Sequence, residues 1–286
     1  MSVPRPLTPR PTAAAEPTAT APPKALSFTP RAARTPVLRI FLYAVEGWGK
    51  TTLGAHAPAP FIVMPRGENG YLTLLDFGRV PSLPAADCAS WADLLATLNA
   101  FLANPGDRKT LVLDGLGAAE RLCHEYVVST QFKGEWGDEG FMAYGKGPDV
   151  ALVPWLTMLH LLERIHDKGI NVIVLGHAKV KPYQNPAGPN FDRFIPDCHE
   201  KTWSATARQF DTVLFGAFKT IVTGAKDLTK KGKGIGGTAR VLYGEQRDSH
   251  VAKNRCGLPE VLELSGDHAE SWNELWAAVS AGKVNE

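Results

Sequence analysis

From residue 37 onward, short apolar runs alternate with longer segments in which apolar residues recur at helical spacing. The short runs are predicted to be buried strands, and they cover residues 36–44, 59–64, 109–115 and 171–178. The longer segments are predicted to be helices, and they cover residues 50–57, 90–104, 118–132 and 149–169. Continuous apolar strands that alternate with helices are typical of a mostly parallel sheet with helices on both faces.

Three of the predicted helices carry capping signals at their ends. Ser90 and Asp93 resemble a capping pair at the start of the second helix, and Gly169 stands where a C-terminal cap is expected. Ser271 and Glu274 have the spacing of a capping box, and this spacing predicts a last helix near the end of the chain.

Two further apolar segments, residues 210–222 and 238–245, are predicted to be strands. They flank a loop rich in Lys and Gly at residues 223–237, and no helix is predicted between them. Parallel neighbours in a sheet are usually joined by a helix, so this pair is expected to be antiparallel. The α/β sheet should therefore carry an antiparallel extension at one edge.

Residues 1–36 differ from the rest of the chain in composition. They contain nine prolines together with Ala, Thr and a few Arg, and they show no aliphatic periodicity. Such a segment cannot bury enough apolar surface to offset the entropy of ordering, so we predict a disordered tail over 1–36 and one folded domain over 37–286. An organelle transit peptide is the alternative, but the proline density argues against the amphipathic helix that it needs.

The overall composition changes this picture little. A net charge of +2 permits a nucleic-acid partner but does not argue for one. The four cysteines, Cys88, Cys123, Cys198 and Cys256, lack metal-ligand spacing and are expected to be reduced thiols. No apolar run approaches the roughly 20 residues that span a bilayer, so we expect a cytoplasmic protein without a membrane partner.

A phosphate-binding loop is predicted between the first strand and the first helix, where residues 44–53 read AVEGWGKTTL. The pattern G-x-x-x-x-G-K-[ST] is complete except that Ala44 replaces its first glycine. Backbone N–H groups of such a loop surround a phosphate, the lysine reaches the β- and γ-phosphates, and the following hydroxyl binds Mg²⁺. We therefore predict that ATP and Mg²⁺ are the cofactors, held by Ala44, Val45, Glu46, Gly47, Trp48, Gly49, Lys50, Thr51 and Thr52.

The third strand ends in LVLDG (residues 111–115), which resembles a Walker B motif. Asp114 is expected to hold Mg²⁺ through water. Many P-loop ATPases place a catalytic glutamate directly after this aspartate, but here that residue is Gly115. The base should therefore come from elsewhere in the chain.

Glu68, just past the second strand, is the candidate for this base. If its strand is adjacent to the P-loop strand, the carboxylate lies near the γ-phosphate and can orient water. His177 ends the fourth strand in VLGHA and is expected to face the nucleotide at the same edge. The alternatives are a solvated turn carboxylate for Glu68 and a surface histidine for His177.

Two cations stand close together in AKNRCGLP (residues 252–259). Lys253 and Arg255 alternate along an extended segment, so both point the same way. They could approach phosphate oxygens in this subunit or in a neighbour, as an arginine finger does. A basic surface turn is the alternative.

Taken in order, these motifs resemble a RecA-type core, and in particular the phage-encoded ATP-binding proteins of the single-strand annealing ATPase family. The resemblance covers roughly residues 37–262. It implies a RecA-like P-loop NTPase fold in which Glu68 activates water and His177 senses the γ-phosphate. It also implies that Lys253 and Arg255 act across a subunit interface in a homo-oligomeric ring or filament, with ATP between subunits.

The resemblance further implies that two segments, residues 131–147 and 179–201, bind single-stranded DNA. Both mix cations for phosphates with rings for bases: Lys133, Trp136, Phe141, Tyr144 and Lys146 in the first, and Lys179, Lys181, Tyr183, Phe191 and Arg193 in the second. Acidic residues in the first segment, such as Glu135, would repel phosphate. The alternative is that these segments are surface loops whose rings pack locally, and the 223–237 loop is either a third contact or a linker.

The resulting hypothesis is an ATPase, stimulated by DNA, that binds single strands and promotes annealing or homologous recombination. Its expected partners are single-stranded DNA, further copies of the chain and a single-strand-binding protein, in the host cytoplasm if a phage encodes it. The second hypothesis is a KaiC-like signalling or assembly ATPase that acts on protein partners. A small-molecule kinase is the third, although no Arg-rich lid is found in the sequence.

Overall fold

The computed structural model describes residues 36–223 and 233–282. The chain divides into two units, Met1–Pro36 and Val37–Glu286, and the helices and strands of the described residues all belong to the second. The predicted tail lies outside the described residues except for Pro36. Most of the Lys- and Gly-rich loop, residues 224–232, also lies outside them.

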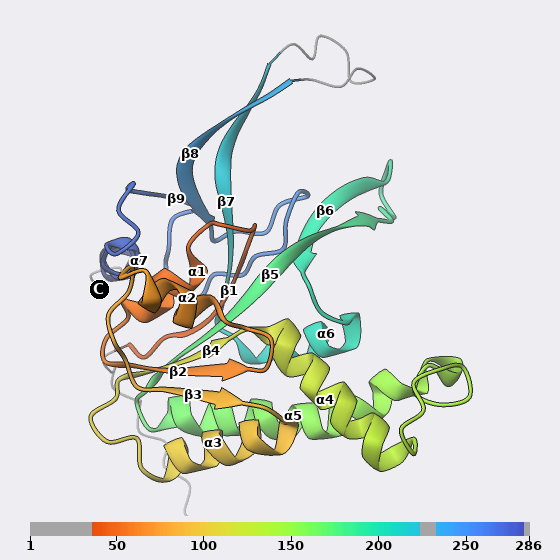
Figure 1. Cartoon of the computed structure of the whole chain (residues 1–286). Coiled ribbons are helices and arrows are strands. Elements are labelled where there is room, and N and C mark those ends of the chain that lie inside the picture. The colour runs from red at the N-terminus through yellow and green to blue at the C-terminus, as the bar shows by residue number, and fades with distance from the viewer. Residues whose placement is uncertain (1–35, 224–232, 283–286) are drawn as a thin grey trace, which may run out of the picture. The chain divides into compact units, whose positions relative to one another are not determined.

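A single mixed sheet organises the second unit (Figure 1). Its strands are β1 (Arg39–Ala44), β2 (Pro60–Pro65), β3 (Ala85–Cys88), β4 (Thr110–Asp114), β5 (Asn171–Tyr183), β6 (Phe191–Pro196), β7 (Thr212–Thr223), β8 (Lys233–Tyr243) and β9 (Val261–Leu264). Their order is β3-β2-β4-β5-β1-β7-β8-β9, and β6 pairs with β5. Neighbours from β3 to β7 are parallel, whereas β8, β9 and β6 are antiparallel to their partners. The predicted fold class, including the antiparallel edge, is confirmed.

Helices cover both faces of this sheet (Figure 1). One face carries α1 (Lys50–Ala55), α2 (Gly70–Asp76) and α7 (Ser271–Ala281). The other carries α3 (Trp91–Ala103), α4 (Leu116–Gln131) and α5 (Lys146–Asp167). A short 3₁₀ helix (Ala143–Gly145) directly precedes α5, and α6 (Glu200–Gln209) packs against α5. The predicted sheet with helices on both faces is therefore what the chain forms.

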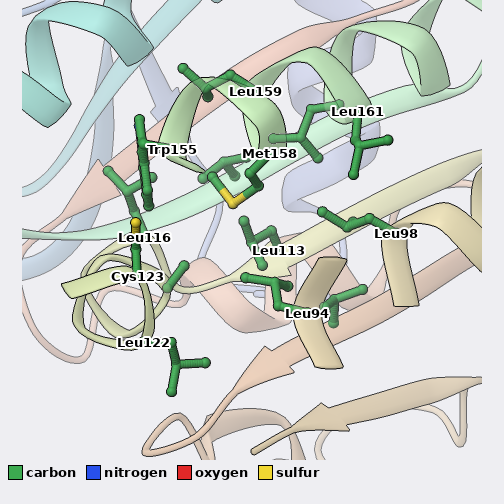
Figure 2. Packing of buried hydrophobic residues seen from close by; sticks show 14 of the residues in the cluster. Leu94, Leu98, Leu113, Leu116, Leu122, Cys123, Trp155, Met158, Leu159 and Leu161 are labelled. Carbon is green, nitrogen blue, oxygen red and sulfur yellow. The ribbon is translucent and has the colours of Figure 1, made fainter. Parts of the chain in front are cut away.

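Alternate side chains of β4 contribute to the two hydrophobic cores on opposite faces of the sheet. Leu111 and Leu113 join the cluster beneath α3, α4 and α5, whereas Val112 between them joins the cluster on the opposite face. Figure 2 shows Leu113 between Met158 of α5 and Leu94 of α3. Successive side chains of a strand point to opposite faces, so an apolar run such as LVLD suits a strand that is covered on both sides.

Both neighbours of the P-loop strand continue beyond it as two-stranded ribbons (Figure 1). In the described part of the chain, β5 pairs only with β6 after His177, and β7 pairs only with β8 after Gly216. The alternative interpretation of residues 179–201 as a surface loop is therefore wrong, because the segment contains the end of β5, the whole of β6 and the start of α6. Pro182 and the polar residues of an exposed ribbon hid the strand pattern.

The capping predictions have mixed outcomes. Asp93 N donates to Ser90 Oγ at 3.2 Å, and Gly169 N donates to the His166 carbonyl just after α5, as expected. The capping box at α7 is wrong. The Ser271 hydroxyl instead accepts a hydrogen bond from the buried Arg240, which needs acceptors. The sequence interpretation also missed α2, β3, α6 and β9.

Candidate functional site

The P-loop joins β1 to α1 at the carboxyl edge of the parallel strands (Figure 1). Gly49 is the N-cap of α1, with φ of 103°, and a side chain there would overlap the ring of His268. Only glycine satisfies both conditions. The first N–H groups of a helix lack acceptors within the helix, so those of α1 are available to a phosphate.

Ala44, the departure from the motif, fits because of its neighbour on β7. It is fully buried and keeps the extended backbone of β1. Its partner across the strands is Gly216, and a Cβ placed on Gly216 would lie 2.7 Å from the Ala44 methyl group. The adjacent strand thus has a glycine at the position where a side chain would collide with the Ala44 methyl group.

The side chain of Trp48 braces the loop from beneath. It is fully buried, its Nε1 donates to the Ala217 carbonyl at 3.1 Å, and the Arg240 guanidinium lies over its ring. Val45 N also donates to the Gly216 carbonyl. Of the predicted phosphate-binding positions, Trp48 can therefore contribute only its backbone, and its side chain fixes the loop on β7.

The polar groups predicted for Mg²⁺ and phosphate are brought together. Thr51 Oγ1 donates to Asp114 Oδ2 at 2.7 Å, and Lys50 Nζ donates to the Ala44 carbonyl at 3.3 Å. Burial raises the pKa of Asp114, and the bond from Thr51 opposes that rise. Burial lowers the pKa of Lys50, against the attraction of Asp114. A hydroxyl and a carboxylate are hard oxygen ligands, so Thr51 and Asp114 fit Mg²⁺.

Glu68 reaches this site by a route that the sequence did not predict. Its strand, β2, is not adjacent to β1, because β4 and β5 lie between them. The turn after β2 nevertheless carries Glu68 across to the end of β4. A Cβ placed on Gly115 would lie 3.1 Å from Glu68 Oε1. Glu68 thus occupies the space beside Asp114 that a glutamate at position 115 would have needed.

His177 stands beside Glu68 at the point where β5 leaves the sheet. Its Nε2 is 3.8 Å from Glu68 Oε2, and its Cα partner on β1 is Ala44, the first residue of the P-loop motif. The contact with Glu68 raises the pKa of His177, and burial opposes that rise. Both side chains are partly exposed, so they can meet a ligand at this edge.

Lys253 and Arg255 lie at the opposite edge of the sheet. Lys253 pairs with Val213 at the start of β7, and its ammonium donates to the last carbonyls of α6. Arg255 contacts Asp211, which also binds Arg39 at the start of β1. Since β1 from end to end spans about 16 Å, these cations do not reach the P-loop of their own chain. They either act on a neighbouring subunit or form the basic surface turn that was the alternative interpretation.

The first predicted DNA-binding segment is divided between buried and exposed residues. Phe141 is 3% exposed and packs against Phe132, His124 and Trp136, so it is not available to stack on a base. Trp136 is 46% exposed and Tyr144 is 97% exposed. The two lysines of this segment, Lys133 and Lys146, are exposed as well.

The second predicted segment forms the β5–β6 ribbon, and its cations are largely paired. The Lys179 ammonium is 3.0 Å from Asp197, and that of Lys181 is 3.4 Å from Glu200. The Arg193 guanidinium lies over the ring of Tyr183, which also contacts the ring of Phe191.

Two parts of the site were missed by sequence interpretation. Arg240 donates to the carbonyls of Ser265 and Asp267 and so ties the C-terminal segment to the P-loop through Trp48. Glu120 in α4 accepts from His199 N at 2.9 and 3.0 Å, and so holds the end of the ribbon. Neither residue belongs to a short motif that could have signalled its role.

The fold and the site together define a P-loop nucleoside triphosphatase. The strand order places β5, with His177 at its edge, between the P-loop strand and the strand of Asp114. Residues 37–256 match the family model described as an AAA domain, and the chain belongs to this family. It is thus an ATPase domain of the P-loop class, and this membership implies nucleotide as substrate.

Comparisons with individual proteins add less. No curated protein matches the chain. Among solved structures it is similar to a prototypical ATPase from the type III secretion system of pathogenic bacteria, with 14% identity and a TM-score of 0.38. The match covers 62% of this chain and 50% of that ATPase, so the chain spans about half its length. Within the described residues, none of the helices has the length and apolar character needed to cross a membrane.

Proposed function

We propose that this protein is a RecA-like ATPase that binds single-stranded DNA and promotes strand annealing or homologous recombination. The observation that carries the proposal is the continuity of β5. The same strand holds His177 beside Glu68 and then continues into the ribbon of Lys179, Lys181 and Tyr183. A single-stranded DNA bound to the ribbon and a phosphate bound beside His177 would therefore contact the same β-strand, β5.

For ATP hydrolysis, each group of the site has a role. Lys50 and the loop N–H groups bind the phosphates, and Glu68 orients the attacking water as a general base. His177 contacts the γ-phosphate and reports its presence to β5. Thr51 and Asp114 would hold Mg²⁺, which neutralises charge on the β- and γ-phosphates when it is bound.

For DNA binding, the ribbon is the better-suited surface. Tyr183, Lys181 and Arg193 supply a ring and two cations on neighbouring strands, and base stacking on such rings contributes about 1–3 kcal/mol per base. The exposed acidic residues Glu135 and Asp138 would repel phosphate from the 131–147 segment. We therefore assign the sugar–phosphate backbone to the ribbon.

The position of Arg255 supports a head-to-tail assembly. It is exposed at the edge of the sheet opposite to the P-loop, where a neighbouring subunit could present its own nucleotide site. Contacts between two different edges generate a ring or an open filament. The ammonium of Lys253 already caps α6, so Arg255 is the better candidate to contact phosphate in trans.

A second candidate function, an assembly ATPase acting on protein partners, is favoured by the ion pairs of the ribbon. Lys179 and Lys181 are each paired with a carboxylate, which lowers the positive potential available to DNA. A protein surface with mixed charges would fit such a ribbon. The two functions differ in whether a nucleic acid binds at all.

Fluorescence anisotropy of a labelled single-stranded oligonucleotide tests the proposal. The wild-type protein with ATP should bind it with an affinity that falls as salt rises. The double variant Lys181→Ala/Arg193→Ala should weaken binding and reduce the salt dependence by up to about one unit of slope per removed contact. Arg164→Ala, on the exposed surface of α5, removes a charge elsewhere and should bind as wild type does. Nucleotide-dependent assembly without any DNA binding would favour the protein-partner function instead.

A further inference from the structure

A cavity of about 810 Å³ lies beside the Glu68–His177 pair. Glu68 and His177 line it, whereas Lys50, Thr51 and Asp114 do not, so it adjoins the phosphate site but does not include the P-loop. Its other walls are the first half of α4, the segment before α5 and the start of α6. An occupant would therefore contact the proposed catalytic pair without contacting Lys50, Thr51 or Asp114.

One wall of the cavity is aromatic. Trp136 is half exposed and its ring centroid lies 5.5 Å from that of the buried Phe141. Phe141 N donates to the Glu135 carbonyl at 2.9 Å, and Met142 N donates to the Trp136 carbonyl at 3.1 Å. These bonds close the backbone of the segment on itself, and the ring contact with Phe141 packs one side of Trp136, so the cavity has a flat aromatic surface.

Next to this aromatic wall lies a polar atom without a partner among the described residues. His124 lines the cavity, and its Nε2 is buried without a hydrogen-bond partner among the described residues. Burial lowers the pKa of His124, which favours the neutral imidazole. A buried polar atom is costly unless a partner satisfies it. Because Nε2 itself is shielded from solvent, an occupant of the cavity contacts other atoms of His124 and not this one.

The charges around the cavity argue against an anionic occupant. Lys179 and Lys201, which line it, are already paired with Asp197 and Asp149 at 3.0 and 2.6 Å. A third cation, Arg121, lines the cavity and donates to the Arg66 carbonyl. Three carboxylates, those of Glu68, Glu120 and Glu200, also line it. A phosphate would meet these carboxylates, whereas a neutral heterocycle with a flat face and a polar edge would not be repelled.

We propose that this cavity receives one nucleobase of the bound single strand, stacked on Trp136 and in contact with His124. The inference rests on the proposed function, because the strand on the β5–β6 ribbon supplies the base. The phosphates stay outside on Lys181 and Arg193, while one base enters. The inserted base contacts Glu68 and His177, and this contact makes hydrolysis sensitive to the strand.

An oligonucleotide that contains 2-aminopurine, whose emission responds to stacking, tests this on the full chain with ATP. Binding of the wild-type protein should change the emission. Trp136→Ala should remove that change and raise the Kd on the order of tenfold, the loss expected for one stacked base. Trp136→Phe should retain most of both. Phe77→Ala removes an aromatic side chain that is 78% exposed and lies outside the cavity, and it should behave as wild type.

A second variant covers the case in which Trp136→Ala does not fold. Met142 lines the cavity and is 59% exposed, so Met142→Trp fills space with little cost to the core. It should also remove the emission change. Strand binding with unchanged emission, and with equal Kd for wild type and both variants, would overturn the cavity assignment and leave the proposed function standing.

Two further arms separate the remaining outcomes. If the free 2-aminopurine nucleoside binds as tightly as the oligonucleotide, the cavity is a small-molecule site and the strand-base assignment is wrong. If wild type binds no oligonucleotide at low salt, the proposed function itself fails, and the cavity assignment fails with it. Weak nucleoside binding with tight, Trp136-dependent oligonucleotide binding is the result expected.

Discussion

At the P-loop, polar side chains are buried and hold one another at short range, whereas on the β5–β6 ribbon they are exposed and spread over two strands. Thr51 and Asp114 are already bonded at 2.7 Å, and Glu68 fills the space beside Gly115. On the ribbon, Lys181 is held by an exposed ion pair, and Arg193 lies over a ring and donates to the carbonyls of Arg247 and Asp248. The nucleotide site is thus preorganised, whereas a ligand on the ribbon would have to displace these partners.

The largest effect is expected at the proposed catalytic base of the nucleotide site, Glu68. Glu68→Gln keeps the size of the side chain but removes its basicity, so ATP should still bind while kcat falls by about 10²- to 10⁴-fold. Steady-state hydrolysis and nucleotide binding should be measured on the same preparation. Glu125→Gln, on α4 with its carboxylate partly exposed, is the matched control and should hydrolyse ATP normally. Normal turnover by Glu68→Gln would remove Glu68 from the chemistry.

The preorganised site should still need a group from outside its own chain. Subunits with Lys50→Ala lack a working P-loop, and subunits with Arg255→Ala lack the proposed trans cation. Each variant alone should be inactive, and an equal mixture should recover activity at about a quarter of the sites, the statistical share expected of a head-to-tail assembly. The assay is ATP hydrolysis after confirmed co-assembly. Failure to recover would place Arg255 outside the site.

The smallest effect concerns the contact between Glu68 and His177. The raised pKa of His177 means that the folded protein binds the proton more tightly than the unfolded chain, whose His pKa is about 6.5. The contact therefore contributes fully below about pH 6.5, and its contribution is lost as pH rises through the folded pKa. Thermal melts from about pH 5.5 to 9 should show the Tm difference between wild type and His177→Gln shrinking with pH. A difference that grows with pH would contradict this assignment.

The same contrast explains what the sequence could predict. The P-loop and Asp114 lie in short motifs whose chemistry depends on adjacent residues, and the buried strands have continuous apolar runs. The ribbon has neither signal, because exposed strands tolerate Pro182 and polar residues. Its presence depends on pairing between β5 and β6, which no local pattern encodes.

Long-range packing accounts for the other differences. β4 and β5 separate β2 from β1, so the adjacency on which the argument for Glu68 depended is absent, yet the turn after β2 places Glu68 beside Gly115. Arg240 links Trp48 to the segment after residue 256, where the AAA domain match ends. Such a link is visible only when the chain is folded.

The central claim, that one continuous strand joins DNA binding to hydrolysis, is tested most directly by ATP turnover with and without single-stranded DNA. The wild-type protein should hydrolyse ATP several-fold faster with the strand. The Lys181→Ala/Arg193→Ala variant should retain its basal rate and lose the stimulation, and Lys50→Ala should be inactive in both conditions. ATP turnover that is equal with and without DNA would contradict the claim and favour a protein partner.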